Sequence, residues 1–223
     1  MGEININQIL DLLVAKYGNR EWQPAYDSLS VLIQTILSQN TSDINSWRAF
    51  RSLKSIFADW EDVANADIDE IAFSIKAGGL GKVKANYIKQ TLHGIKWKRG
   101  KLDLDFLDKL SLSEAREWLI QLPGVGAKTA NCVLLFSSGR PALPVDTHIY
   151  RVAKRLGLID TKASVHQAHV LLEDMVSSGD VYRFHVLMIE HGRKICHAQR
   201  PRCSECVLRG LCPAYDKFAI KSA

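Results

Sequence analysis

The sequence has few of the features that mark exported or membrane proteins. Its wholly apolar runs are short, residues 132–136 being an example, and cannot span a bilayer. Residues 1–6 do not follow the basic-then-apolar pattern of a secretory signal, and Ile6 stands where a myristoylation motif needs serine or threonine. We therefore expect a cytoplasmic protein with no membrane partner.

Proline is scarce, at 6 of 223 residues, and no stretch of five or more residues alternates convincingly as a strand between hairpin turns. Apolar residues instead recur every three or four positions, which predicts helices. A first helix carries Ile6, Ile9, Leu10, Leu13 and Val14 on one face and ends at Gly18. A second carries Leu29, Leu32, Ile33, Ile36 and Leu37, and a third carries Trp47, Phe50, Leu53, Ile56 and Phe57.

Further helices are expected around residues 67–76, 82–97, 113–121, 127–137, 147–156, 165–177 and 182–196. Asp67 and Ser113 are candidate N-caps, because acidic residues follow each of them in the first turn. The sequence therefore predicts an all-α chain.

Cysteine is also rare, and the odd total of five argues against a disulfide framework. Four of the five crowd together near the C-terminus as C-x6-C-x2-C-x5-C: Cys196, Cys203, Cys206 and Cys212. Four thiolates at this spacing suit either a tetrahedral zinc ion or a [4Fe–4S] cluster, and the spacing alone leaves both open. Cys132 lies in an apolar run and is expected to be a small buried residue without a function.

A glycine turn joins two predicted helices at residues 119–130. Pro123 ends the first helix, and both Gly124 and Gly126 can take positive φ angles. Such a turn leaves backbone N–H groups pointing outward at the start of the next helix, where they can bind a phosphate. The alternative is an ordinary helical corner. The net charge of +5 and the pI near 8.9 are weak support for a polyanionic partner.

Lys128 lies in the first turn after this glycine turn, where the helix dipole opposes a cation. Partial desolvation would further favour the neutral, nucleophilic amine, although Lys128 could also simply contact phosphate. Asp146 begins another predicted helix, where it can serve as an N-cap. If its carboxylate faces the glycine turn, it can stabilise developing positive charge or accept a proton from Lys128.

The string Leu-Pro-Gly-Val-Gly-Ala-Lys-Thr-Ala at 122–130 resembles the helix-hairpin-helix element of DNA-repair glycosylases. With Lys128, Asp146 and the cysteine spacing, nearly the whole chain resembles the endonuclease III family. The resemblance implies a two-domain helix-hairpin-helix DNA glycosylase fold. Residues 24–139 would form a six-helix barrel, and residues 1–23 with 140–223 would form an iron–sulfur cluster domain. It also implies that Lys128 is the nucleophile, that Asp146 is the essential carboxylate, and that the four cysteines hold a [4Fe–4S] cluster.

The implied function is base-excision DNA repair by a bifunctional enzyme that removes damaged bases, oxidised pyrimidines in particular, and cleaves the abasic site by β-elimination. The implied partner is double-stranded DNA with a damaged base or abasic site. We expect a monomer, nucleoid-associated if the source is prokaryotic. DNA contacts are expected from Gly124, Val125, Gly126, Thr129, Gln39, Asn40, His148, Arg200 and Arg202.

The chain departs from the family in the segment that fills the gap left by an extruded base. The usual string is Ser-Ala-Gln-Ala-Thr-Asp, whereas residues 38–43 read Ser-Gln-Asn-Thr-Ser-Asp. Asn40 aligns with the usual glutamine and Gln39 with an alanine, so the preferred lesion can differ. The alternatives are a glycosylase for mismatched uracil or thymine or for oxidised guanine, and a non-catalytic DNA-binding module. An adenine glycosylase and an electron carrier fit the sequence less well.

Overall fold

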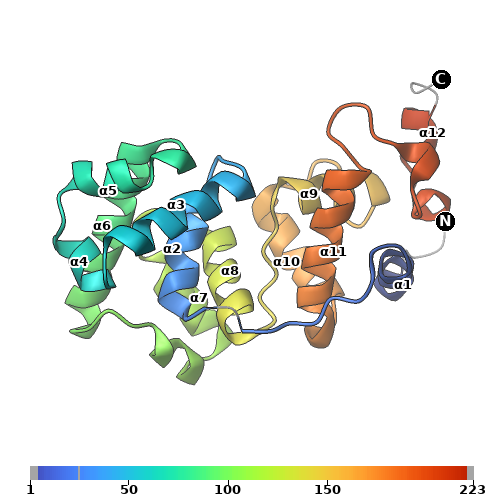
Figure 1. The fold of residues 1–223 in the computed structure, drawn as a ribbon. Helices are drawn as coiled ribbons and strands as arrows, with labels where there is room; N and C mark the ends of the chain where they lie inside the picture. Colours follow the sequence, from blue (N-terminus) through green and yellow to red (C-terminus); the bar gives the residue numbers. More distant parts are fainter. Residues whose placement is uncertain (1–4, 25, 220–223) are drawn as a thin grey trace. The chain divides into compact units, whose positions relative to one another are not determined.

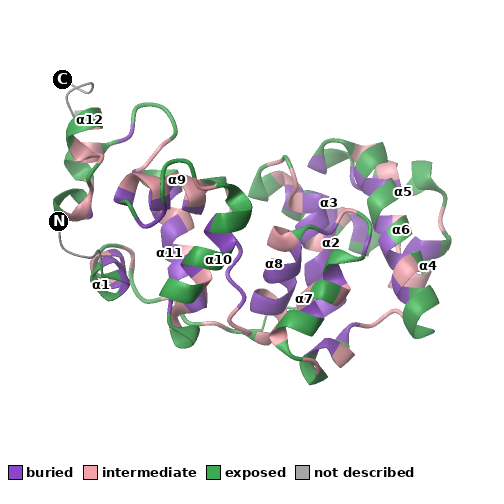
Figure 2. Cartoon of the chain, turned by 180° about the vertical axis from the view of Figure 1, so that it is seen from behind, coloured by how far each residue is buried: buried purple, intermediate pink, exposed green. Residues whose placement is uncertain are grey.

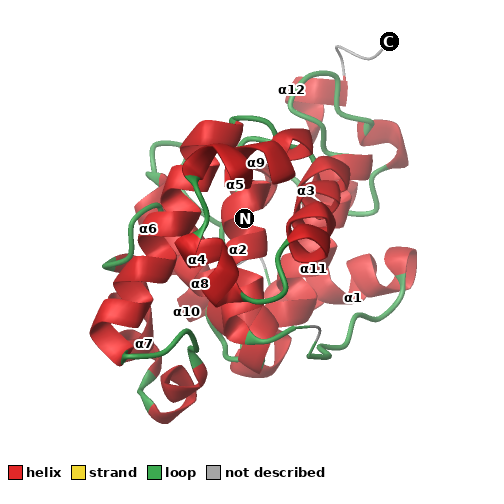
Figure 3. Ribbon diagram, turned by 60° about the vertical axis from the view of Figure 1, so that its left-hand side comes forward, coloured by secondary structure: helices red, strands yellow, loops and turns green. Residues whose placement is uncertain are grey.

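A computed structural model describes residues 5–24 and 26–219. Within those residues the chain contains helices and no strand, as Figure 3 shows, so the all-α prediction is confirmed. The chain divides into two compact units, one of residues 24–140 and one of residues 1–23 with 141–223. Residues 1–4, which the signal-sequence argument used, lie outside the described part of the chain. No described helix is long and apolar enough to cross a membrane.

The unit of residues 24–140 is built around one buried helix (Figures 1 and 2). Its elements are α2 (Ser28–Ser38), α3 (Asp43–Ile56), α4 (Trp60–Asn65), α5 (Ile68–Ser74), η1 (Lys76–Gly78), α6 (Gly81–Arg99), η2 (Asp105–Lys109), α7 (Leu112–Ile120) and α8 (Ala127–Ser138). Helix α2 packs against α8, α3 and α6, and nearly every residue in it is buried. Burial of an apolar helix on several sides explains why α2 has almost no polar face.

The second unit centres on α11 (Val181–Lys194), which packs against α9 (Thr147–Leu156) and α1 (Ile6–Tyr17). The remaining elements are α10 (Val165–Met175), η3 (Ser178–Asp180), η4 (Cys203–Glu205), η5 (Arg209–Leu211) and α12 (Tyr215–Ala219). A Cβ atom on Gly192 would lie 2.9 Å from the Cβ of His148, so this glycine lets α9 and α11 approach closely. α11 thus packs against the N-terminal helix α1 and leads along the chain into the cysteine-rich segment.

The predicted helices are all present, but three local details are wrong. The N-cap of α7 is Ser111, not Ser113, because the Ser111 hydroxyl accepts the N–H of Glu114 in a capping box. The expected apolar stripe of α3 breaks at its end: Ile56 is exposed and Phe57 follows the last helical residue. The helices α4 and α12 were not predicted, since six and five residues are too few to establish a periodic pattern.

Candidate active site and metal centre

The two glycines in the turn between α7 and α8 differ in backbone conformation and in the space around them. Gly124 has a φ of +76°, and a Cβ atom there would lie 2.9 Å from Cγ of Tyr87. Gly126 is the N-cap of α8 with a φ of −96°, and a Cβ atom there would have no other heavy atom within 4 Å. Only Gly124 uses the positive φ that both glycines allow, whereas Gly126 has a backbone conformation that any residue can adopt.

Two side chains from other helices hold the carbonyl groups of this turn. The Thr91 hydroxyl on α6 donates to the Pro123 carbonyl at 2.8 Å. The Gln39 amide, at the C-terminal end of α2, donates to the Gly124 carbonyl at 3.0 Å and lies 3.5 Å from the Thr129 hydroxyl. Because both carbonyls are bound from within the unit, the turn is held in one orientation.

The N-terminal end of α8 has unused hydrogen-bond donors. The first intrahelical bond runs from the Ala130 N–H to the Gly126 carbonyl, so the N–H groups of residues 127–129 have no acceptor within the helix. The Val125 N–H bonds the Leu122 carbonyl, and the Val125 side chain is buried. Any contact that Val125 makes with DNA would therefore involve its carbonyl group or close backbone approach. The N-terminus of α8 is the stronger candidate for a phosphate site.

Lys128 lies at this N-terminal end, in the first turn of α8, as predicted. Its side chain is half-buried, while the next four residues, 129–132, are buried. Cys132 is among them, as expected. The Lys128 backbone is thus held in a helix whose following residues are buried.

Asn40 and Leu80 are two exposed residues with left-handed backbone conformations, at φ angles of 52° and 51°. Buried Lys84 fixes the segments that precede them. Its ammonium donates to the Leu37 carbonyl at 2.7 Å and to the Gly78 carbonyl at 2.8 Å. Burial lowers the pKa of Lys84. Asn40 is an expected DNA contact; no such expectation attaches to Lys84, or to Leu80, which lies between Gly79 and Gly81 in a second glycine turn.

Asp146 lies in the other unit and caps α9, as predicted. Its Oδ1 accepts the Ile149 N–H at 2.8 Å, which uses one of the two carboxylate oxygens. His148, two positions further on, is half-buried, and burial, opposed by the Asp146 charge, lowers its pKa. Lys128 and Asp146 belong to different units, and their pairing stays a prediction.

The four cysteines of the C-terminal segment line one cavity, together with Arg155, Arg209 and mainly apolar residues. In the described part of the chain, no three His, Cys, Asp or Glu side chains gather closely enough to hold a single metal ion. The positive observation is that all four cysteine side chains line the same cavity, so the residues present fit an iron–sulfur cluster.

Burial keeps three of these thiols protonated when no metal is bound. Burial and the neighbouring thiols raise the pKa of Cys206 to about 11, and burial also raises the pKa of Cys203 and of Cys212. The protein alone therefore favours neutral thiols, and the positive charge of iron would have to drive their deprotonation.

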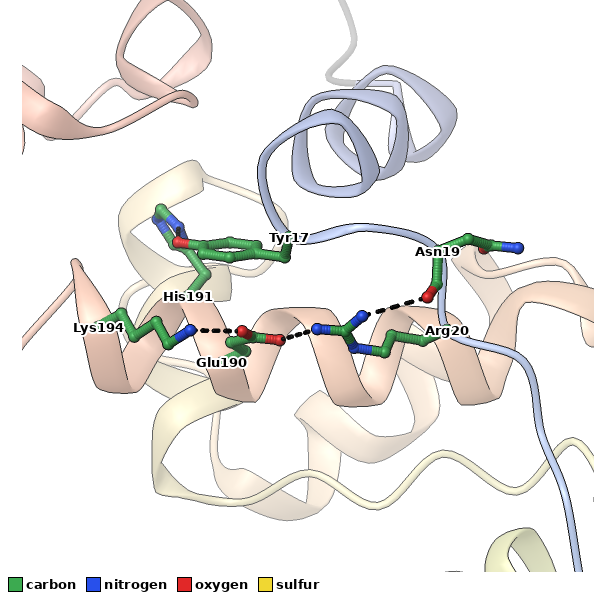
Figure 4. Close-up of polar contacts among 6 residues, drawn as sticks. All are labelled: Tyr17, Asn19, Arg20, Glu190, His191 and Lys194. Atoms are coloured by element: carbon green, nitrogen blue, oxygen red, sulfur yellow. Dashed lines mark hydrogen bonds and ion pairs between the residues drawn. The ribbon is translucent and has the colours of Figure 1, made fainter.

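Two side chains that the sequence did not single out contact the cysteine sulfurs. Arg155 donates through Nη1 to Cys196 Sγ at 3.2 Å and to the His197 carbonyl at 2.7 Å. His191 on α11 lies with Nε2 3.5 Å from Cys206 Sγ and with Nδ1 3.0 Å from the Tyr17 hydroxyl. Figure 4 shows Tyr17 beside the His191 ring. Neither contact is visible in the sequence, because the partners are 41, 15 and 174 positions apart.

The two arginines predicted to contact phosphate, Arg200 and Arg202, are exposed in the loop between the first two cysteines. Arg200 has a φ of +49°, while Arg202 pairs with Glu205 at 2.7 Å. An exposed pair of this kind is weak and can be exchanged for a phosphate. A second link joins this region to α9, since Arg151 donates to the Cys196 carbonyl at 2.9 Å.

Comparison with known proteins agrees with this arrangement. The HhH-GPD superfamily of base excision DNA repair proteins matches residues 33–177, and the iron–sulfur binding domain of endonuclease III matches residues 196–212. A putative DNA glycosylase of Arabidopsis thaliana is 40% identical over 168 residues, which are 75% of this chain and 57% of that protein. Endonuclease III of Sulfolobus acidocaldarius is 35% identical over 188 residues, 83% of this chain and 82% of that protein.

A solved non-covalent endonuclease III–DNA complex superposes with a TM-score of 0.83 and 28% identity, covering 96% of this chain and 97% of that one. The helical fold, the glycine turn and the four-cysteine cavity thus define a base excision DNA repair protein with a helix-hairpin-helix. The chain belongs to the endonuclease III family within the HhH-GPD superfamily.

Membership in this family gives the class of enzyme. The chain is a DNA-binding glycosylase and abasic-site lyase of base-excision repair, and its cofactor is the expected [4Fe–4S] cluster. The alternative of a non-catalytic DNA-binding module is therefore set aside. When bound, the cluster would fix the segment from Cys196 to Cys212 against α9 and α11.

Proposed function

We propose that this enzyme excises a damaged base and cleaves the remaining abasic site with Lys128 as its nucleophile. The observation that carries the proposal is the α7–α8 turn, whose carbonyls are bound by Thr91 and Gln39 while Lys128 stands in the first turn of α8. A phosphate on the free N–H groups of α8 would bring a deoxyribose close to the Lys128 amine.

The chemistry needs the neutral amine of Lys128. Its nitrogen forms a bond to C1′ of the deoxyribose as the bond from C1′ to the base breaks, and the base leaves with a proton. Opening of the sugar ring then gives an imine between Lys128 and C1′. The imine acidifies the proton on C2′, and loss of that proton expels the 3′ phosphate and cuts the strand.

Asp146 is the proposed carboxylate of this reaction. Its capping bond to Ile149 fixes the position of the carboxylate and uses only Oδ1. A fixed anion beside the sugar stabilises the positive charge that develops as the base departs, and it can accept the proton of the Lys128 ammonium. The N-cap and the catalytic role are compatible because a carboxylate has two oxygens.

We further propose that the DNA backbone binds along residues 124–129 and at His148, Arg200 and Arg202. The Gln39 amide already donates to the Gly124 carbonyl, whereas Asn40 is exposed. Asn40 is therefore the better candidate to fill the gap left by an extruded base. Oxidised pyrimidines are the proposed substrates. Mismatched uracil or thymine and oxidised guanine remain the second candidates, because Gln39 and Asn40 depart from the usual family string.

Borohydride trapping on abasic duplex DNA tests the nucleophile. We expect wild type to form a covalent adduct and Lys128→Ala to form none. Lys82→Ala is the matched control: this lysine also follows a glycine turn, in the first turn of α6, but it is exposed and paired with Asp69. Trapping by Lys128→Ala at the wild-type level would overturn the assignment.

The same assay on Asp146→Asn tests the carboxylate. Asparagine caps a helix about as well as aspartate, so α9 is retained while the charge is lost. We expect slower base excision with unchanged thermal stability.

Duplexes with single lesions then identify the substrate. Light scattering, with and without DNA, tests the proposed monomer, and imaging in the source cell tests the proposed cytoplasmic, nucleoid-associated location.

A further inference from the structure

A chain of contacts runs from the N-terminal helix to one of the four cysteines. The Tyr17 hydroxyl, at the end of α1, lies 3.0 Å from Nδ1 of His191, and Nε2 of the same ring lies 3.5 Å from Cys206 Sγ. His191 is only 1% exposed, and the Tyr17 ring meets it edge-on at a centroid distance of 6.1 Å. All three residues belong to the same unit.

The direction of these hydrogen bonds follows from the groups involved. A cysteine that binds iron is a thiolate, which can only accept. Nε2 of His191 must therefore carry the proton that it shares with Cys206 Sγ. A neutral imidazole has one N–H, so Nδ1 is an acceptor and the Tyr17 hydroxyl must donate to it. The contacts define one tautomer of His191 and one orientation of the Tyr17 hydroxyl.

The surrounding residues keep Tyr17 in this position. Glu190 on α11 accepts from Arg20 at 3.1 Å and from Lys194 at 2.7 Å, and Figure 4 shows this network along the outer side of α11. The Lys194 ammonium lies 5.5 Å from the centre of the Tyr17 ring. The segment after α1 is thus held to the helix that carries His191, on the same side as the Tyr17 ring.

We propose that Tyr17 and His191 are positioning residues for the iron–sulfur cluster, which raise its reduction potential and slow its oxidative loss. A hydrogen bond to a cluster sulfur withdraws negative charge, so it stabilises the reduced cluster more than the oxidised one. The Tyr17 hydroxyl strengthens this effect, because a donor at Nδ1 makes the Nε2 proton more acidic. The inference rests on Cys206 being a cluster ligand.

This role differs from that of Arg155, which also donates to a cysteine sulfur. Arg155 brings a permanent positive charge to Cys196 and also binds the His197 and Ala198 carbonyls. His191 brings no such network of carbonyl contacts; its two ring nitrogens are used by Tyr17 and Cys206. Its influence on Cys206 can therefore be changed by removing a single hydroxyl group, that of Tyr17.

The test uses the full-length holoenzyme and four variants. Tyr17→Phe removes the hydroxyl and keeps the ring, His191→Leu removes the donor, and His191→Gln keeps an N–H near the position of Nε2. Tyr150→Phe is the matched control, because its hydroxyl donates to the Ala163 carbonyl in the same unit. Voltammetry gives the potential of the cluster, and a chromogenic iron chelator with ferricyanide as oxidant gives the rate of iron release.

We expect Tyr17→Phe and His191→Leu to shift the potential to more negative values, with the larger shift in His191→Leu. Iron release should accelerate about 10- to 100-fold in His191→Leu, the usual range for losing a hydrogen bond to a metal ligand. His191→Gln should lie close to wild type, and Tyr150→Phe should equal it.

Two results would overturn the proposal. One is an unchanged potential in Tyr17→Phe, a variant that retains the ring packing and so does not depend on His191→Leu folding. The other is a His191→Gln potential equal to that of His191→Leu, which would mean that the N–H has no effect. Absence of iron and sulfide from the wild-type protein would instead contradict the cofactor assignment itself.

Discussion

At the scale of single residues, the glycine turn is specified by contacts as much as by its own sequence. Glycine is required at position 124 for two reasons: its φ is positive, and a Cβ atom there would lie too close to the Tyr87 ring. Gly126 is required by neither, since its φ is ordinary and the space around it is open. A glycine that the fold does not need is a candidate for contact with a ligand, because its missing side chain lets a phosphate approach the backbone.

Replacement by alanine should therefore affect stability and DNA binding differently at the two glycines. Gly124→Ala should lower the free energy of unfolding by about 1–3 kcal/mol, since alanine is strained at positive φ, and the contact with Tyr87 adds to this cost. Gly126→Ala should change the free energy of unfolding by less than about 1 kcal/mol, because the gain through the unfolded state is offset by the weaker N-cap that alanine makes. The same methyl group should weaken binding to abasic duplex DNA.

Urea unfolding measures the first effect, and fluorescence anisotropy at one fixed salt concentration measures the second. Each variant is the control for the other. If Gly126→Ala binds DNA as tightly as wild type, no phosphate approaches the backbone at this point. That result would leave Lys128 without its proposed means of reaching the sugar.

At the scale of helices, hydrogen bonds at the ends decide where each element begins. α7 shows this, because Ser111 and Ser113 both precede acidic residues and only one of them can be the N-cap. Ser111 takes this position since its hydroxyl accepts the Glu114 N–H at 3.3 Å while Glu114 accepts the Ser111 N–H at 2.8 Å. The three-residue spacing between serine and glutamate is what a capping box needs, and Ser113 lacks it.

Ser111→Ala should therefore lower the melting temperature, at a cost of about 1 kcal/mol in the free energy of unfolding. Ser113→Ala, inside the first turn of α7, should have little effect. The side-chain and backbone hydrogen bonds from Ser111 lower the pKa of Glu114. Glu114 therefore stabilises the fold above the usual glutamate pKa, and this contribution is lost as the pH falls through its lower folded value.

Thermal unfolding of wild type and both variants at neutral and acid pH checks this prediction. The difference between wild type and Ser111→Ala should shrink on acidification, because protonated Glu114 is a weaker acceptor. A larger loss of stability in Ser113→Ala than in Ser111→Ala would place the helix start two residues later and contradict the capping box.

At the scale of the whole molecule, the two units differ in what holds them together. The unit of residues 24–140 has α2 buried among α8, α3 and α6. The segment from Cys196 to Cys212 has only short 3₁₀ turns, η4 and η5, and few buried side chains. An apolar core stabilises the unit of residues 24–140, whereas we expect the segment from Cys196 to Cys212 to depend on its metal.

Removal of iron should therefore act on the segment from Cys196 to Cys212 and spare the unit of residues 24–140. After chelation under anaerobic conditions, we expect amide protons of residues 196–212 to exchange rapidly with solvent. Those of α2 and α8 should exchange at the holoenzyme rate, because their packing does not involve the cysteines. Hydrogen exchange with mass spectrometry measures both segments in one sample. Equal loss of protection in α2 would mean that the units do not fold independently.

The sequence by itself determined the parts of this protein that depend on near neighbours in the chain. Helix spacing, the Asp146 and Asp67 caps, the glycine turn with Lys128, and the spacing of the four cysteines are patterns within a few residues of one another. Short-range sterics and hydrogen bonding fix such features wherever they occur. The resemblance to endonuclease III rests on them, and comparison confirmed it.

Only the tertiary structure decided which polar side chains are used in internal hydrogen bonds and which are exposed. Gln39 binds the turn 85 positions away and leaves Asn40 exposed, and Lys84 joins the ends of α2 and η1. Tyr17 reaches His191 across 174 positions, and His191 reaches Cys206. No local pattern encodes these contacts, since each partner gains its position from the packing of a different helix.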